Sequence, residues 1–414
     1  MKLTDHKDYI RFWVASTTSD FGTYITTLAL QVLVVVNLNG NTVDVGRINS
    51  SRWLPYVLLG LVAGVLLDRV SRRPVLVVTD IGRGVLLAMI CLMTAFHLIN
   101  IGWLIIIMML FGAMSLFNDA AYQSFVPQLV PRGLLTRANA RLEQSAAVAQ
   151  TSGPAIAGTL VSFIGAPFAI LIDAVSYVFS GLVMASIKHQ HIREKASDER
   201  LSEQIKEGLR WVYRHRYLGT LALNTHAWFL FNCMINTVFV TFALTELGFN
   251  TSTLGLVMTL AGIGAVIGTT FSTRAAQRFG IGRSMAFSRI LYCPAGILMV
   301  LAPSANHGVL LTVTLLMIGF GQFLYGFALG IEGPLEMGYQ QSITPARLQG
   351  RMNATKRSIN RSMIVIGAPL GGIIADVFGF RTALWVAIAG LAVVGVWFTL
   401  SPMRDAQIDE NVSS

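Results

Sequence analysis

The chain has 414 residues, of which 54% are apolar and 13% are charged, and its formal net charge is +10. Its mean hydropathy of +0.61 lies far above the range of soluble domains. The composition therefore excludes a soluble globular protein and directs attention to segments that could lie in a membrane.

Twelve stretches are apolar and long enough to cross a membrane as helices, which takes about 20 residues for a hydrocarbon core of about 30 Å. In chain order they cover residues 10–37, 44–67, 74–97, 102–126, 138–164, 167–187, 218–245, 252–275, 283–302, 308–332, 355–377 and 381–401. Lipid admits only helices or closed barrels, and the alternating pattern of a barrel is absent. We therefore predict an all-α membrane protein with twelve transmembrane helices.

The placement of the basic residues predicts the topology. If the N-terminus is inside, all of the 31 Lys and Arg residues except Arg47, Arg52 and Arg381 fall at the inner ends and in the inner loops. This asymmetry is the positive-inside rule, so both termini are expected in the cytoplasm of a bacterial inner (plasma) membrane. The basic charge then reflects topology, and nucleic acid is not an expected partner.

The first span carries a polar and aromatic stripe at helical spacing. Its members are Trp13, Thr17, Asp20, Tyr24, Thr27 and Gln31. Asp20 lies about 16 Å into the span, near the midplane. A charge there costs roughly 2.5–3.5 kcal/mol, so it needs a partner or a function. Because burial disfavours an ionised acid, we expect Asp20 to exchange a proton or to contact a cationic substrate. The alternative is a local hydrogen bond beside Gly22.

A charged motif lies at the polar seam between the second and third spans. The stretch GVLLDRVSRR contains Gly64, Asp68, Arg69, Arg72 and Arg73. It resembles the helix 2–3 loop of the major facilitator superfamily of secondary transporters, G-x-x-x-D-R-x-G-R-R, with Ser71 at the last glycine. The resemblance implies a cytoplasmic latch in which Asp68 contacts the positive end of a helix from the other half. Asp80 and Arg83 in the third span could join this latch. Topogenic charge would explain the arginines but not Gly64 and Asp68.

Acidic residues also occur in the fourth and tenth spans, toward their cytoplasmic ends. Asp119 with Tyr122 nearly matches Glu332 and Glu336 at an offset of 214 residues. These acids could bind substrate or protons, or they could form gate salt bridges. The candidate cations for such a gate are Arg141, Lys356, Arg357 and Arg361. We favour the gate for Glu336 and leave Asp119 and Glu332 open.

The same offset of 214 residues relates two halves of the chain. Seven identities carry the repeat, with Pro131, Arg137, Asn139, Ala140, Gly153, Gly158 and Gly165 falling onto Pro345, Arg351, Asn353, Ala354, Gly367, Gly372 and Gly379. Such parallel repeats are what the six-helix halves of this superfamily show. We expect two pseudo-symmetric six-helix bundles, residues 1–187 and 218–414, with a cytoplasmic linker at 188–217. Leu201, Ile205, Leu209 and Val212 predict an amphipathic helix in that linker, as opposed to a solvated coil.

Two further patterns bear on the substrate. Gly153, Pro154 and Gly158 resemble the helix 5 signature of exporters, although Ser145 and Ala149 replace its upstream glycines. In the seventh span, Trp228, Asn232 and Asn236 recur at a spacing of four. An indole and two amides suit a large amphipathic ligand, and helix–helix hydrogen bonding is an equal alternative.

A narrower resemblance covers most of the chain. PRGLLTRANARLEQ, SGPAIAG, EQIKEGLRWVYRHRYL and TPARLQGRMNA are similar to the drug:proton antiporter group that contains macrolide-efflux and enterobactin-exporter relatives. The resemblance implies a secondary transporter that exports amphipathic small molecules in exchange for protons, and we expect it to act as a monomer. Lysophospholipid or siderophore export is the alternative, and a non-transporting sensor is a more distant one. No catalytic, phosphate-binding or metal-ligand pattern predicts an enzyme, a metal or a cofactor.

Overall fold

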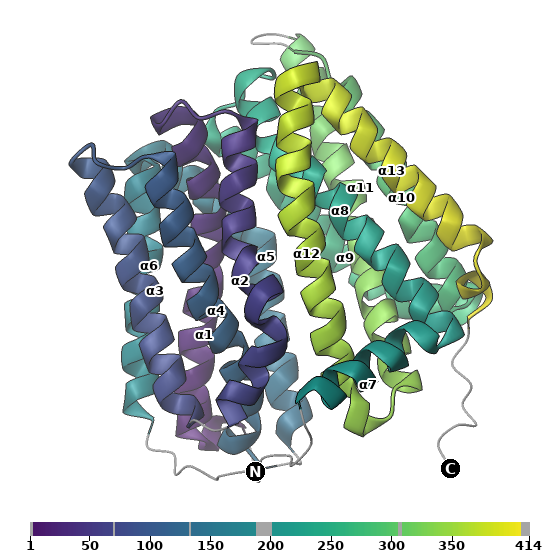
Figure 1. Cartoon of the computed structure of the whole chain (residues 1–414). Coiled ribbons are helices and arrows are strands. Elements are labelled where there is room, and N and C mark those ends of the chain that lie inside the picture. The colour runs from purple at the N-terminus through teal and green to yellow at the C-terminus, as the bar shows by residue number, and fades with distance from the viewer. Residues whose placement is uncertain (1–2, 69–70, 132–133, 188–200, 305–308, 407–414) are drawn as a thin grey trace. The chain divides into compact units, whose positions relative to one another are not determined.

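The computed structural model describes residues 3–68, 71–131, 134–187, 201–304 and 309–406, and these residues contain thirteen α-helices and no strand (Figure 1). The α-helices are α1 (Lys7–Val32), α2 (Thr42–Asp68), α3 (Arg72–Ala95), α4 (Ile101–Leu129), α5 (Leu135–Ile164), α6 (Ala166–Ser186), α7 (Leu201–Arg214), α8 (Arg216–Thr245), α9 (Thr251–Phe279), α10 (Ile281–Leu301), α11 (Val309–Ile343), α12 (Ala346–Phe378) and α13 (Phe380–Leu400). Short turns η1 (Leu3–Asp5), η2 (Leu33–Asn37) and η4 (Pro402–Asp405) complete them. The predicted all-α membrane fold is confirmed.

Eleven helices in the described part of the chain are long and apolar enough to cross a membrane. The remaining long helix, α2, has 27 residues and runs into positions whose side chains lie outside the description. The short helix α7 has a polar composition and is too short to span.

Local sequence signals set the helix ends. Asn100 and Asn250 cap α4 and α9, their side-chain oxygens accepting from the backbone N–H of Trp103 and Thr253 at 3.0 and 2.8 Å. Gly165 and Gly379 join α5 to α6 and α12 to α13 at φ values of +81° and +89°, a backbone conformation that favours glycine. The repeat therefore preserves a glycine at both positions because both make the same turn.

The chain divides into two compact units. The first comprises Met1–Gly40 and Arg47–Leu201, and the second comprises Asn41–Gly46 and Ser202–Ser414. In the first, α1 packs against α5 and α6, and α3 packs against α4 and α6. In the second, α8 packs against α12 and α13, and α10 packs against α11 and α13. Each pairing in one unit thus has its counterpart in the other, as the 214-residue repeat requires.

Helix α7 belongs to the second unit. Its Glu207 pairs with Arg351 of α12, and its Trp211 Nε1 donates to Thr344 Oγ1 at 3.4 Å. Val212 is fully buried in a cluster with Leu218 and other residues of the unit. The apolar side of the predicted amphipathic helix is therefore covered at least in part by protein.

Close helix packing in the second unit depends on glycine. A Cβ at Gly326 or Gly330 of α11 would collide with the backbone carbonyls of Ala261 and Ala265 on α9. The same holds in reverse for Gly264 of α9 against Phe323 of α11. Small residues let two helix backbones approach in this way, so these glycines are packing points between α9 and α11.

We expect Gly326→Ala to destabilise the protein by about 1–3 kcal/mol, because the added methyl group overpacks the α9–α11 contact. The measurement is the melting temperature of the purified protein in detergent. Gly338→Ala on the same helix is the matched control, since a Cβ there meets nothing within 4 Å, and it should leave the melting temperature unchanged or slightly raised. Equal effects of the two substitutions would contradict the packing role.

Candidate functional site

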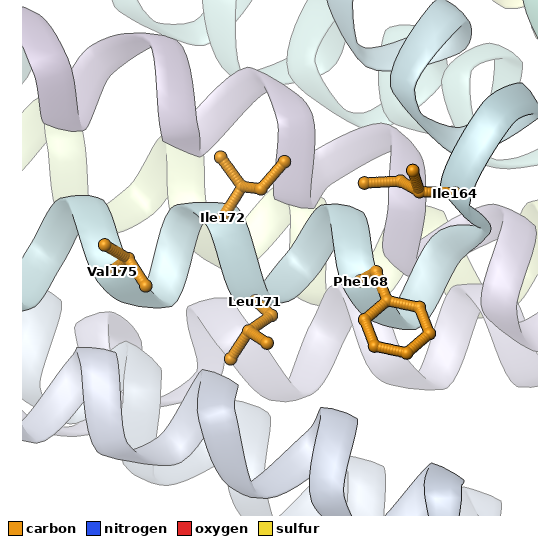
Figure 2. A pocket seen from close by; sticks show the side chains of 5 residues that line it. All are labelled: Ile164, Phe168, Leu171, Ile172 and Val175. Atoms are coloured by element: carbon orange, nitrogen blue, oxygen red, sulfur yellow. The ribbon is translucent and has the colours of Figure 1, made fainter.

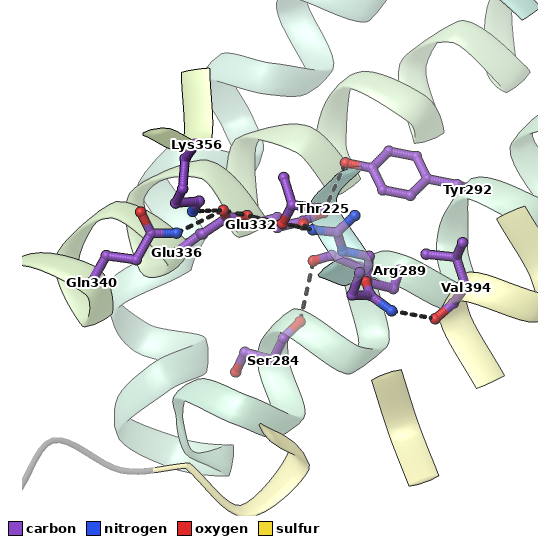
Figure 3. Close-up of polar contacts among 11 residues, drawn as sticks. Thr225, Ser284, Arg289, Tyr292, Glu332, Glu336, Gln340, Lys356 and Val394 are labelled. Atoms are coloured by element: carbon purple, nitrogen blue, oxygen red, sulfur yellow. Dashed lines mark hydrogen bonds and ion pairs between the residues drawn. The ribbon is translucent and has the colours of Figure 1, made fainter. Parts of the chain in front are cut away.

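A buried group of charged residues lies inside the second unit (Figure 3). We call it the ion cluster, and its members are Thr225 of α8, Arg289 and Tyr292 of α10, Glu332 and Glu336 of α11, and Lys356 of α12. Arg289 forms ion pairs with both glutamates, and Lys356 Nζ pairs with Glu336 Oε1 at 2.9 Å. Two cations thus balance two carboxylates. Such balance is what allows four ionised groups to remain in an apolar interior.

The two glutamates differ in the number of hydrogen bonds and ion pairs that they make. Glu336 accepts hydrogen bonds from Lys356 at 2.9 Å, from Gln340 at 2.7 Å and from Thr225 at 3.1 Å, in addition to its contact with Arg289 at 3.4 Å. Glu332 has the close ion pair with Arg289 and accepts one hydrogen bond, from Tyr292 at 3.0 Å. Glu332 is therefore the carboxylate of the cluster that can be neutralised with the smaller loss of hydrogen bonds.

Arg289 is the centre of the cluster. Its side chain is 1% exposed, and its guanidinium carbon lies 5.7 Å from the Trp228 ring and 5.9 Å from the Phe398 ring. Within the described part of the chain, Nε and Nη1 have no hydrogen-bond partner. The guanidinium is thus buried beside aromatic rings, and within the cluster it contacts both carboxylates.

Aromatic side chains continue from the ion cluster along α8, α10 and α11. The ring centroids of Trp228 and Tyr292 are 5.5 Å apart, and those of Tyr292 and Tyr325 are 5.4 Å apart. Tyr325 donates to Asn232 Oδ1 at 2.8 Å, and the exposed Asn236 donates to the backbone oxygen of Asn232 at 2.9 Å. The structure thus brings Trp228 and Asn232 of the predicted stripe to the same aromatic group as Glu332.

In the first unit, two acids on other helices act electrostatically on Asp20. Asp20 near the middle of α1 is half-buried and lies within electrostatic reach of Asp119 on α4 and Glu143 on α5. Asp119 accepts a hydrogen bond from Tyr56 of α2 at 2.8 Å. The described residues supply Asp20 with neither a hydrogen bond nor an ion pair. A carboxylate among like charges and without a donor is suited to binding a proton or a cation.

The rest of the α1 stripe is directed in part toward α5. Trp13 Nε1 donates to Ser145 Oγ at 2.8 Å, and Arg141 lies 4.0 Å from the Trp13 ring. A Cβ at Gly153 would come within 2.6 Å of Tyr24 Cβ, so this glycine admits Tyr24. Thr17 and Gln31 have side-chain oxygens that are buried without partners among the described residues. The Tyr122 ring is tilted against that of Phe12, with the ring centroids 4.8 Å apart. Pro154 is half-buried and Gly158 is buried.

Asp80 and Arg83 form a polar group within the first unit. They pair with each other, Asn118 and Ser180 donate to Asp80 at 2.9 and 2.7 Å, and Arg83 lies 4.3 Å from the Tyr177 ring. Both carboxylate oxygens of Asp80 are therefore occupied by neighbours on α3, α4 and α6.

The motif itself is only partly described. Arg73 donates to the backbone oxygens of Met184 and Ala185 at the end of α6, and Arg72 is buried. The surroundings of Gly64, the side chain of Asp68, and Arg69 as a whole lie outside what the structure describes. The latch stays a prediction.

Several functional candidates escaped the sequence reasoning. Arg289 and Asp173 are charged residues inside predicted spans, and a charge in such a position already indicates a functional or paired residue. Asp173 is fully buried and accepts from Thr26 and Ser176 at 2.5 and 2.9 Å. His226 of α8 lies between Asn360 at 2.6 Å and Tyr213 of α7 at 2.8 Å. Burial raises the pKa of the Tyr213 phenol, so its hydroxyl stays protonated and can donate to His226.

An apolar hollow lies on the outer surface of the first unit (Figure 2). It has a volume of about 590 Å³ and is lined by Ile164, Phe168, Leu171, Ile172 and Val175. Phe168 and Val175 are more than half exposed. Apolar side chains of this kind on a membrane-spanning helix suit contact with lipid chains, and no titratable group lines the hollow.

Comparison with known proteins gives a consistent result. A family model described as Transmembrane secretion effector matches residues 5–414. The chain is similar to Macrolide efflux protein A of Streptococcus pyogenes, at 22% identity over 89% of this chain and 90% of that protein. It is also similar to the Staphyloferrin A transporter of Staphylococcus aureus, at 23% identity over 94% of this chain and 95% of that protein. The crystal structure of the nucleoside transporter NupG has the same fold, with a TM-score of 0.76 and 10% identity. The match covers 97% of this chain and 100% of that chain.

Proposed function

The chain belongs to the Transmembrane secretion effector family of the major facilitator superfamily, and we propose that it exports amphipathic small molecules in exchange for protons. It is a multi-pass membrane transporter of small molecules and not an enzyme. Both termini are assigned to the cytoplasm of a bacterial inner membrane, and the protein acts as a monomer by alternating access. No cofactor takes part in this scheme.

The ion cluster is the observation that carries the proposal. It is electrically balanced when Glu332 and Glu336 are both ionised, because Arg289 and Lys356 supply two positive charges. A proton on Glu332 leaves one positive charge in excess in a buried site. Such a charge is costly in a low-dielectric interior. Proton binding therefore changes the relative free energy of conformations that differ in how they solvate or pair this site.

The free energy of proton binding is large enough to couple protonation to a change of conformation. One unit of pKa difference between two conformations is worth 1.36 kcal/mol, a ten-fold change in their ratio. Asp20 in the first unit supplies a second acid that can take up a proton or hold a cationic group. In a superfamily whose substrates bind near the midplane between the repeats, one titratable site in each unit suits exchange of a proton for a substrate.

The side chains near Glu332 support this substrate class. The half-buried Tyr325 presents an aromatic ring packed on the buried Tyr292, which in turn contacts the buried Trp228, and Asn232 with the exposed Asn236 offers amide groups. Sites that combine apolar walls with a few polar groups bind amphipathic ligands. The similarity to Macrolide efflux protein A supports drug-like substrates. Siderophore export is the second candidate, supported by the similarity to the Staphyloferrin A transporter.

Transport into everted membrane vesicles tests the function. Vesicles from cells that produce the protein, energised so that their interior is acidic, are expected to accumulate a fluorescent amphipathic dye or a labelled macrolide several-fold above control vesicles. Collapse of the proton gradient with a protonophore should return accumulation to the control level. Accumulation that persists after this collapse would contradict proton coupling, and absence of accumulation for a broad panel of amphipathic compounds would contradict the substrate class.

A further inference from the structure

A second hollow of about 500 Å³ lies in the second unit, at the turn between α9 and α10. We call it the basic hollow, and the residues that matter here are Arg278, Phe279, Arg283, Arg404 and Asp405. Phe279 ends one candidate membrane span and Ile281 begins the next. The hollow therefore lies at the level where two helices leave the hydrocarbon, on the side that the proposed topology makes cytoplasmic.

The wall formed by η4 is held firmly in place. Met403 of η4 is fully buried among residues that include Met285 and Phe398. The backbone N–H of Gly282 donates to the Ala406 oxygen at 3.3 Å, and a Cβ at Gly282 would collide with the backbone oxygens of Met403 and Arg404. The glycine thus lets η4 approach the start of α10, which keeps Arg404 and Asp405 beside Arg283.

The hollow has an excess of positive charge. Arg278, Arg283 and Arg404 line it together with a single acid, Asp405. Arg283 pairs with Asp405 at 3.6 Å, but the two side chains are 61% and 71% exposed. An exposed ion pair of this kind contributes little free energy, so it does not neutralise the site strongly and can open to admit an anion.

An apolar group borders the same site. Phe279 is 59% exposed, and the guanidinium of Arg278 lies 5.5 Å from its ring. Phe271, two turns earlier on α9, is also exposed. Arginine pairs bidentately with phosphate oxygens, while an exposed phenylalanine at the end of a span can contact acyl chains. The neighbouring positive and apolar groups match the two parts of a phospholipid.

We propose that the basic hollow binds the phosphate of an anionic phospholipid, with Phe279 against the acyl chain. Basic pockets beside membrane helices recognise headgroups in this manner. The inference is independent of the transported substrate and of proton coupling. Free inorganic phosphate shares the recognised group, and the apolar border is what favours the lipid as its source.

Lipid binding to the purified full-length protein in detergent is the test, measured by native mass spectrometry and by thermal stabilisation. The probes are phosphatidylglycerol, phosphatidylcholine and inorganic phosphate. Arg283→Gln combined with Arg404→Gln is expected to weaken phosphatidylglycerol binding about 25-fold, or about five-fold for each arginine removed. Asp405→Asn should strengthen it, because that change removes the one negative charge in the hollow.

Arg274→Gln is the matched control. Arg274 is an exposed arginine one turn before Arg278 on α9 that does not line the hollow, so its substitution should leave the preference for phosphatidylglycerol unchanged. An equal loss in this control and in the double variant would overturn the site, as would a double variant that binds like the unaltered protein. Stabilisation by inorganic phosphate as large as that by phosphatidylglycerol would overturn the assignment to a lipid.

Discussion

Glu332→Gln is expected to uncouple export from the proton gradient while leaving the protein folded. Glutamine has nearly the shape of a protonated glutamate and can still accept the hydrogen bond from Tyr292. It cannot ionise, so the ion cluster stays fixed in the state with one excess positive charge. Uphill accumulation of dye in everted vesicles should fall by about ten-fold or more, corresponding to at least one unit of lost pKa difference. Exchange of labelled for unlabelled substrate, which needs no proton movement, should continue.

Glu336→Gln is the comparison that separates coupling from structure. Either substitution leaves two buried cations with one carboxylate. Glu336, however, is contacted by Lys356, Arg289, Gln340 and Thr225, whereas Glu332 is contacted by Arg289 and Tyr292. Breaking a buried ion pair in this way costs about 3–5 kcal/mol. We therefore expect both variants to melt at a lower temperature than the unaltered protein, and Glu336→Gln, which disturbs the larger number of hydrogen bonds, to have the lower melting temperature and yield of the two. Proton-dependent accumulation by Glu332→Gln at the unaltered level would remove Glu332 from the coupling scheme.

The fold could be predicted because its signals are strong and local. A membrane helix needs about 20 apolar residues regardless of its neighbours, so hydropathy along the chain locates it. The 214-residue repeat in addition predicts that the two halves of the chain are structurally equivalent. Its Gly165 and Gly379 make the same turn, and its Gly153 and Gly367 both admit a neighbouring helix, α1 in one unit and α8 in the other.

Partners across helices could be predicted only as sets of candidates. The sequence offers four candidate cations for the proposed gate at Glu336, and the structure pairs Glu336 with one of them, Lys356, and with Arg289, which is not among the four. Arg141, another of the four, lies on the Trp13 ring in the first unit. Helical spacing tells which residues share a face of one helix, but it does not tell which neighbouring helix meets that face or at what height.

The central residue of the ion cluster shows this limit most clearly. Arg289 lies in an apolar stretch of α10, and its partners Glu332 and Glu336 come from α11. The cost of burying a charge predicts that Arg289 must have a carboxylate nearby, yet the chain contains many acids. Only the packing of α10 against α11 selects these two glutamates as its partners, and it gives them different numbers of hydrogen bonds.

Asp20→Asn is expected to abolish uphill export without destabilising the protein. Asparagine keeps the volume of aspartate but cannot bind and release a proton. Since the described residues give Asp20 no hydrogen bond or ion pair, little folding free energy is lost with its charge. Removing a charge that is repelled by Asp119 and Glu143 should even relieve some repulsion. Accumulation of amphipathic substrate in energised everted vesicles should fall by about ten-fold or more, with an unchanged or raised melting temperature.

Asp173→Asn is the matched control variant for this experiment. Asp173 is also carried by a helix of the first unit, but both its oxygens accept hydroxyl hydrogen bonds, from Thr26 and Ser176. An amide in its place loses an acceptor in a fully buried site, which costs about 1–3 kcal/mol, so stability should fall while proton dependence persists. Comparison of cationic with neutral substrates then decides between the two roles of Asp20. If Asp20→Asn loses only the cationic substrates and still exports neutral ones against their gradient, Asp20 recognises the substrate's charge and proton coupling belongs to the ion cluster alone.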